Sequence, residues 1–277
     1  MQSSIRRFVT KLPAKAQKRK ETRKGMQFTR EILSAVCRVV AVLCLAAITA
    51  EANGTQSVTI KMSLPGDVQI EAQSSTPANS WSFRNAYAGV LGIAERINDF
   101  HATTASGQDA GVKKIATGEF CSALHATKIS YRVNVSKPTA ADVSHVSWIA
   151  GDYGLLMLAD LLPRDFASVS IRFELPEGWG VDGSNSADAD LHQVIAPEKA
   201  IFLVGRSFGN AQGSVGNTSV TTVVGGSWPF KERDALSSAT KVMKSYQELT
   251  GYQWSGGVLI MIVPLPVKIG NLSLIHI

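Results

Sequence analysis

Cysteine is scarce in this chain of 277 residues, which holds only Cys37, Cys44 and Cys121. Small secreted proteins that lack a large core depend on several disulfides. One cysteine remains after the first 52 residues, so the sequence excludes a disulfide framework in the body of the chain. The body must be stabilised by burial of apolar side chains, and its hydrophobic content of 45% is ordinary for a globular protein.

Histidine is also scarce, with five residues, and no complete catalytic motif contains one. The sequence lacks His-Glu-x-x-His, a P-loop and a dinucleotide-binding fingerprint. His101, His125 and His145 are isolated in the sequence, so we expect surface or half-buried roles for them rather than ligation. We therefore assign no catalytic, cofactor-binding or metal-binding residue in this chain.

Positive charge is confined to the start of the chain, although the formal net charge is +6. Residues 1–38 hold 11 Lys and Arg against 2 Asp and Glu. The remaining residues hold 17 against 20, which makes the body mildly acidic. Because binding to a phosphate backbone needs a basic surface, we expect no nucleic-acid partner.

No apolar run is long enough for a comfortable membrane span, but one is long enough for a secretory signal peptide. Arg30 and Arg38 supply the positive region, and Val39–Thr49 is the short apolar core. Ala50-Glu51-Ala52 fits the small-residue cleavage pattern. Residues 1–52 are thus predicted to be a basic leader and signal peptide. We expect an exported protein that is periplasmic, cell-envelope or secreted, with membrane association only through an uncleaved leader.

The body is predicted to be mainly β, with a β-sandwich over residues 53–229. The clearest strand alternates Val169, Ile171, Phe173 and Leu175 on one face, the period-two pattern of a half-buried strand. The segment 56–63 and the following Val68 and Ile70 predict a hairpin. Ser74–Ser80 is expected to be a polar connector and Ala88–Asn98 is left open. The other expected strands are Trp81–Tyr87, Val112–Cys121, Lys128–Val135, Val194–Val204 and Thr218–Val224.

The pattern changes near Trp228. Apolar residues at three- and four-residue spacing predict a helix over Asp234–Thr250, with Asp234 as the N-cap and Gly251 after the C-terminus. A continuous apolar strand over Gly257–Val263 follows, and such a strand needs cover on both faces. We expect residues 230–270 to be the truncated start of a second domain. The last six residues can be read back as CTG TCT CTT ATA CAC ATC, a transposon end used in sequencing adapters, so residues 271–277 are expected to be an adapter-derived tail.

One motif has the form of a serine-hydrolase nucleophile elbow, Gly205-Arg206-Ser207-Phe208-Gly209. That motif requires a sharp turn from a strand into a helix, with an acid and a histidine later in the chain. The continuation here has loop composition, and the later histidine, His276, lies in the expected tail. A hairpin loop is the favoured interpretation.

Oxygen-bearing residues alternate between Asp182 and Asp190, loosely as in a calcium-binding loop. Such a loop normally has Gly at the sixth position and Glu at the twelfth, where this chain has Ala187 and Gln193. His192 lies close enough to Asp188 and Asp190 in sequence for a transition-metal site. A solvated loop is favoured over both metal sites.

The order of several stretches resembles the glycyl-aminopeptidase family, which are PDZ-containing zinc metallopeptidases of the gluzincin group. The similarity runs from about Val58 to Pro266 and none of its stretches is a catalytic signature. The stretches are Trp81–Gly89 (WSFRNAYAG), Ala94–Phe100 (AERINDF), Ile129–Val133 (ISYRV), His145–Trp148 (HVSW), Gly154–Pro163 (GLLMLADLLP) and Phe173–Trp179 (FELPEGW).

The resemblance implies an N-terminal β-sandwich, then a thermolysin-like α/β catalytic domain, then a PDZ domain. The segment 230–270 resembles the opening of the catalytic domain, a helix followed by a strand. In that family His-Glu-x-x-His and a later Glu hold zinc, which activates water for peptide hydrolysis. These residues lie beyond this sequence, so we expect zinc and peptide substrates for the full-length parent and an inactive fragment.

A non-enzymatic cell-envelope β-sandwich binding module is the alternative. It accounts equally well for the leader, the strands and the lack of catalytic residues. It does not account for a capped helix followed by a buried-type strand. The oligomeric state stays open.

Overall fold

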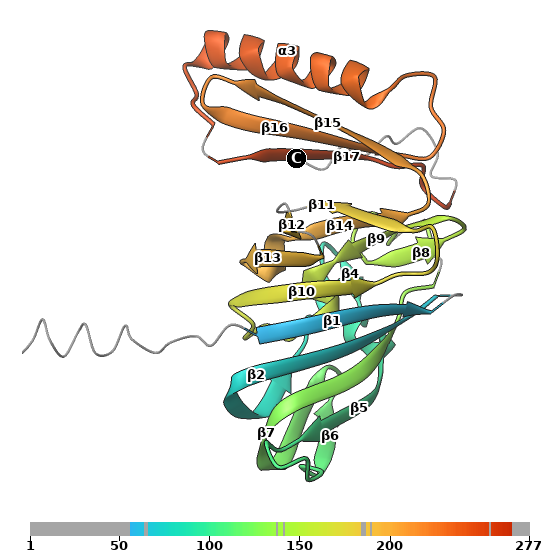
Figure 1. Ribbon diagram of the computed structural model, residues 1–277, viewed down its shortest axis with the longest axis vertical. Coiled ribbons are helices and arrows are strands. Elements are labelled where there is room, and N and C mark those ends of the chain that lie inside the picture. Colours follow the sequence, from blue (N-terminus) through green and yellow to red (C-terminus); the bar gives the residue numbers. More distant parts are fainter. Residues whose placement is uncertain are drawn as a thin grey trace, which may run out of the picture. The chain divides into compact units, whose positions relative to one another are not determined.

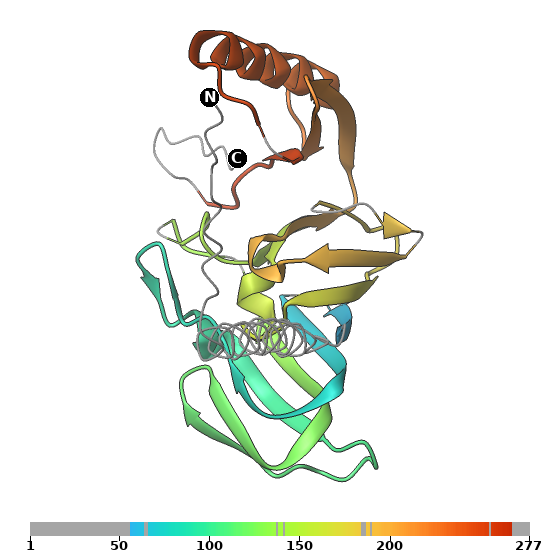
Figure 2. The same cartoon turned by 90° about the vertical axis from the view of Figure 1, so that its left-hand side faces the viewer.

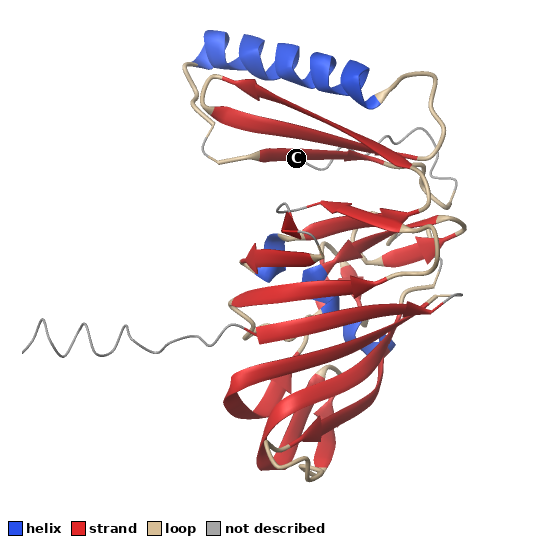
Figure 3. Ribbon diagram, in the orientation of Figure 1, coloured by secondary structure: helices blue, strands red, loops and turns tan. Residues whose placement is uncertain are grey.

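The computed structural model describes residues 56–63, 66–136, 138–140, 142–183, 187–188, 190–254 and 256–267 (Figure 1). The expected leader, residues 1–52, and the expected tail, residues 271–277, lie outside the described residues. Strands dominate the described chain (Figure 3), which confirms the mainly β prediction. No helix among the described residues has both the length and the apolar character needed to cross a membrane.

A large sheet of eight strands forms one layer of the sandwich. Its order is β12-β13-β10-β1-β2-β7-β5, and β6 pairs with β7. Its central strand β1 pairs antiparallel with β2 and parallel with β10, so residues far apart in sequence lie side by side. The strands are β1 (Gln56–Ser63), β2 (Asp67–Ser82), β5 (Ile97–Thr103), β6 (Val112–Ala116), β7 (Glu119–Asn134), β10 (Ser168–Glu174), β12 (Ala187–Asp188) and β13 (Leu191–Ile195).

The first hairpin is confirmed, but its second strand is longer than expected. Ser63 pairs with Asp67 across the turn. Ser74–Ser80, expected to be a connector, lies inside β2. The register of β2 against β7 shifts between Gln73 and Ser80, and a proline can occupy such an irregular stretch because no regular ladder bond is lost there. The polar composition therefore reflects an exposed, bulged strand.

A smaller sheet of four strands forms the other layer, in the order β11-β14-β9-β8. Its strands are β8 (Trp148–Ala150), β9 (Tyr153–Met157), β11 (Gly180–Gly183) and β14 (Ile201–Gly205). The stretch expected as strand over Val194–Val204 supplies a strand to each sheet, because Pro197 begins a 3-10 turn, η2 (Pro197–Lys199), between β13 and β14. Proline suits the first position of such a turn, where its missing N–H is not needed.

The two sheets enclose one hydrophobic core, which confirms the β-sandwich. Ile60, Ile70 and Ile171 of the large sheet are fully buried with Leu156 and Phe202 of the small sheet. The open region 88–98 resolves into β4 (Val90–Leu91), paired with β3 (Ala86–Tyr87), and a 3-10 turn, η1 (Ile93–Arg96). A short helix, α2 (Leu158–Leu161), continues directly from β9.

A three-stranded sheet follows, in the order β15-β16-β17, with one long helix packed along β15 and β16 (Figures 1 and 2). The elements are β15 (Phe208–Val215), β16 (Thr218–Gly225), α3 (Glu232–Thr250) and β17 (Val258–Ile262). β15 and β16 form a hairpin, and β17 pairs parallel with β16. This sheet takes strands from both sides of the boundary that we expected between residues 229 and 230.

The helix is confirmed, with a different cap from the one expected. α3 begins at Glu232, so Asp234 is the third helical residue, and its carboxylate accepts the backbone N–H of Lys231 at 3.0 Å. Gly251 ends the helix at φ 70°, a left-handed conformation that favours glycine, and its N–H bonds to the Gln247 carbonyl. Of the expected apolar face, Met243 is buried, whereas Val242, Tyr246 and Leu249 are exposed.

Candidate functional site

Ser207 lies in a turn between two strands. The chain leaves β14 at Gly205 and enters β15 at Phe208, so the residues after the serine form a strand rather than the helix that a nucleophile elbow requires. Close packing against backbone explains Gly205, whereas the neighbour of Gly209 is the flexible end of a side chain. A Cβ at Gly205 would lie 2.6 Å from the Asp152 carbonyl, and one at Gly209 would lie 2.8 Å from the Glu232 carboxylate. The motif is therefore a packed turn between strands.

The described part of the aspartate-rich loop has structural roles. Asp182 accepts the amide of Asn210 at 2.6 Å, which joins β11 to β15. Ser184 and Ser186 lie outside the described residues, and so does the side chain of Asp188. His192 is buried, and its ring packs edge-on against Phe173 and Phe202 with centroids 5.3 and 5.2 Å apart. These contacts make His192 a core side chain.

The other described histidines lie on different elements. His101 is on β5, His125 is on β7, and His145 lies before β8 with its ring against Tyr87. Among the described residues no three His, Cys, Asp or Glu side chains are grouped so as to hold a metal ion. The described side chains therefore supply no zinc site, and we assign no chemical step to zinc in this chain.

A buried charge cluster, which the sequence did not reveal, joins the η1 region to α2. Asp160 is 2% exposed and accepts hydrogen bonds from Arg84, from Arg96 at 3.3 Å and from the Ser147 backbone N–H at 2.6 Å. Burial lowers the pKa of Arg96, and the charge of Asp160 opposes that shift. An acid inside the apolar run Leu155–Leu162 was the available signal. Its partners, 64 and 76 residues away, could not be paired from sequence.

The sandwich and the three-stranded sheet meet at a tight junction formed by Tyr153, Leu203, Gly225, Gly226 and Pro264. The Tyr153 hydroxyl donates to the Pro264 carbonyl at 2.6 Å, and burial raises the pKa of this tyrosine. A Cβ at Gly225 would lie 3.1 Å from Leu203, and one at Gly226 would lie 2.5 Å from Pro264. Gly225, the last residue of β16, therefore permits the close approach of Leu203 from the sandwich, whereas Gly226 permits the close approach of the segment that follows β17.

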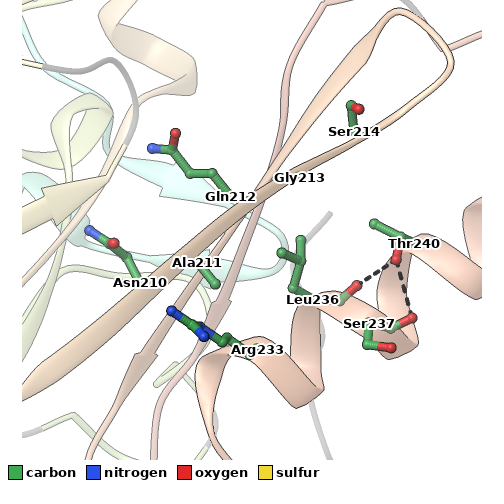
Figure 4. Close-up of a pocket in the computed structure, with 9 residues that line it drawn as sticks. All are labelled: Asn210, Ala211, Gln212, Gly213, Ser214, Arg233, Leu236, Ser237 and Thr240. Atoms are coloured by element: carbon green, nitrogen blue, oxygen red, sulfur yellow. Dashed lines mark hydrogen bonds between the residues drawn. The ribbon is translucent and has the colours of Figure 1, made fainter.

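A groove runs between β15 and α3 (Figure 4). Its cavity volume is about 830 Å³. Residues 210–214 of β15 form one wall, and Arg233, Leu236, Ser237 and Thr240 of α3 form the other. Arg233 is the one charged side chain among these lining residues, and it lies at the Asn210 side of the groove (Figure 4). No sequence pattern predicts this groove, because the groove depends on how the helix lies on the sheet.

Comparison with known proteins shows a fold that this chain shares with part of a solved structure. No family model and no curated protein matches this chain. An aminopeptidase N family protein from Idiomarina loihiensis is similar in structure, with a TM-score of 0.62 and 13% identity over 74% of this chain and 38% of that one. An M1 zinc metallopeptidase from Deinococcus radiodurans matches with a TM-score of 0.40 and 10% identity, over 78% of this chain and 56% of that one. The chain thus spans little more than a third of the first neighbour and shares the fold of that part.

Proposed function

We propose that this chain is the N-terminal part of an exported zinc-dependent aminopeptidase, related to the glycyl-aminopeptidases, in which the sandwich packs beside the catalytic domain. The observation that carries the proposal is the order of parts: a two-sheet sandwich is followed at once by β15, β16, α3 and β17. An aminopeptidase N family structure has a similar fold over 74% of this chain, which supports the proposal. In this proposal the three-stranded sheet with its helix begins the catalytic domain, so that domain starts near Arg206, earlier than residue 230.

The junction supports a fixed position of the sandwich against the catalytic domain. The bond from Tyr153 to Pro264 joins the small sheet to the segment that follows β17, and Gly225 permits the close approach of Leu203. In the parent, residues beyond this segment would supply the zinc ligands and the general base. The chain's own contribution is to hold the sandwich beside the cleft that peptide substrates enter, and the fragment alone is inactive.

The experiment that tests the proposal is to sequence the gene downstream of Asn271 and to express the extended reading frame. The expected result is His-Glu-x-x-His within about a hundred residues and a later Glu, the pattern that binds zinc in this class of peptidase. The extended protein should release amino-acid p-nitroanilides, lose that activity with a chelator and regain it with zinc. A continuation without a metal motif would overturn the proposal and favour the non-enzymatic binding module.

Export is a separate part of the proposal. It rests on the basic segment, the short apolar core and the Ala50-Glu51-Ala52 pattern. Expression of the extended gene in its host should yield a mature protein that begins near Asn53, as read by N-terminal sequencing. A full-length protein that keeps its first 52 residues and stays in the cytoplasm would contradict it.

A further inference from the structure

The strand β15 has one unpaired edge. All eight of its residues pair with β16, from Phe208 opposite Gly225 to Val215 opposite Thr218, and no other described strand pairs with it. An unpaired edge presents a row of free backbone N–H and C=O groups, onto which another extended chain can add as a strand. The groove lies along this edge.

The backbone groups that point outward belong to residues that line the groove. The turn between β15 and β16 contains two residues, and the pair that closes such a hairpin is hydrogen-bonded. Inward and outward residues then alternate along the strand, which directs the backbone groups of Asn210, Gln212 and Ser214 outward. The Thr222 hydroxyl reaches the Ala211 carbonyl at 3.4 Å, which fits an inward-pointing Ala211.

The strand itself carries none of the sequence features that block strand addition, and α3 lies above one side of its edge. Proteins block edges with charged side chains, proline, bulges or a very short strand. The sequence of β15, FGNAQGSV, has no charged residue and no proline, and its register against β16 shows no irregularity. An edge of this kind beside a groove has room for an added strand.

The helix α3 forms the second wall of the groove and contributes its one charged lining residue, Arg233. Arg233, Ser237 and Thr240 are spaced so that they lie along one side of α3, above the edge of β15. Among the described residues no carboxylate is within ion-pair distance of Arg233. Of its acidic neighbours, Asp234 accepts the Lys231 N–H, and the Glu232 carboxylate lies beside Gly209; neither is among the residues that line the groove. The groove is therefore complementary to an extended chain that carries a negative charge.

We propose that the groove between β15 and α3 binds an extended peptide segment of a partner protein, which adds to β15 as a further strand and places a carboxylate against Arg233. The backbone bonds supply affinity that depends little on sequence, and Arg233 selects acidic segments. This site is separate from the aminopeptidase proposal and does not depend on it.

The test uses the whole chain and fluorescein-labelled octapeptides of alternating valine and threonine, with glutamate near one end or near the other. Fluorescence anisotropy should show saturable binding of one of the two peptides. A matched peptide with glutamine for glutamate should bind about three- to fivefold more weakly, the range of an exposed ion pair. A further peptide carries N-methyl groups on alternate backbone amides, those that would face β15. It should not bind, because it cannot donate hydrogen bonds to the strand.

Two pairs of variants locate the site. Arg233→Gln should weaken binding of the glutamate peptide about three- to fivefold and leave the glutamine peptide unchanged. Lys241→Gln, an exposed residue of the same helix that does not line the groove, should change neither. Gln212→Pro removes an outward N–H without breaking the ladder with β16 and should abolish binding, whereas Gln212→Ala should retain it. Circular dichroism checks that each variant is folded.

Several results would overturn the proposal. Binding that is insensitive to both Arg233→Gln and Gln212→Pro would place the peptide elsewhere, for instance on the open edge of β17. Equal binding of the methylated peptide would exclude strand addition. A dimer that Gln212→Pro dissociates, seen by sedimentation without any peptide, would make a second copy of this chain the occupant. Absence of binding at millimolar peptide would exclude the site.

Discussion

At the scale of single residues, we expect the stability of this protein to depend strongly on its buried polar side chains. Asp160 is surrounded by two arginines and a backbone N–H. Tyr131 is fully buried, and its hydroxyl donates to the Leu161 carbonyl at 2.7 Å. Both residues connect the large sheet or its loops to the segment around α2. A polar group in such a position is costly to leave unpaired.

Replacing Asp160 by asparagine should destabilise the protein by about 3–5 kcal/mol, because it leaves two largely buried guanidinium groups without a countercharge. Asp99→Asn is the matched control, since Asp99 pairs with Arg132 on the exposed surface. That change should cost less than about 1 kcal/mol. Urea unfolding measures both. Equal losses would show that the Asp160 cluster contributes no more than a surface pair.

Replacing Tyr131 by phenylalanine should cost about 1–2 kcal/mol at neutral pH, because the Leu161 carbonyl loses its buried donor. Burial raises the pKa of Tyr131 well above its ordinary value, and Asp165 adds to the shift. Since the folded pKa is the higher one, the contribution is complete below the unfolded pKa of about 10 and is lost above it, where only the unfolded tyrosine ionises.

The measurement for Tyr131 is the free energy of unfolding between about pH 9 and pH 11, a window set by the ordinary tyrosine pKa. The unchanged protein should lose stability with rising pH more steeply than Tyr131→Phe. Parallel curves for the two proteins would contradict the assignment of the pH dependence to this residue.

At the scale of single elements, sequence patterns found the elements but not always the faces that they bury. The period of three and four residues correctly predicts α3, and Gly251 ends it as expected. The burial of α3 is narrower than the pattern suggests: Met243 is 7% exposed, whereas Val242 is 70% and Leu249 is 86% exposed. A three-stranded sheet covers only one side of a helix, and the sequence pattern does not show how much of the helix surface the sheet buries.

Met243→Ala and Val242→Ala form a matched pair of neighbours on α3. Met243 packs with Val215 and Val220 of the hairpin, so its truncation should cost about 2–3 kcal/mol. The exposed Val242 should tolerate alanine with a change below about 0.5 kcal/mol, since alanine also favours helix. Thermal unfolding distinguishes the two. A larger loss at Val242 would show that this face is covered in solution.

At the scale of the whole molecule, the described chain ends on an apolar strand with an open edge. β17 pairs with β16 on one side only, and its residues are half-buried. Val258 and Ile260 pack against the helix side, so Leu259 and Met261 lie on the opposite face. An apolar strand of this kind pairs with other chains when it is exposed.

Leu259→Lys should therefore reduce self-association of the expressed chain, because a charge on an edge strand opposes edge-to-edge pairing. Val258→Lys is the comparison and should unfold the helix and sheet, since that side chain packs in their small core. Size-exclusion chromatography and circular dichroism give both results. A chain that is monomeric before substitution would contradict the expectation of an aggregation-prone edge.

The sequence by itself determined the mainly β class, the first hairpin, the helix with its terminating glycine and the apolar strand after it. These features depend on local periodicity and on the conformational preferences of single residues. Only the tertiary structure decided that Ser74–Ser80 is strand, that Val194–Val204 divides between two sheets, and that β15 and β16 join β17. It also brought Asp160 to its arginines and made the groove beside β15. Strand pairing and ion pairing over long separations depend on which distant surfaces fit together, and local patterns do not encode that fit.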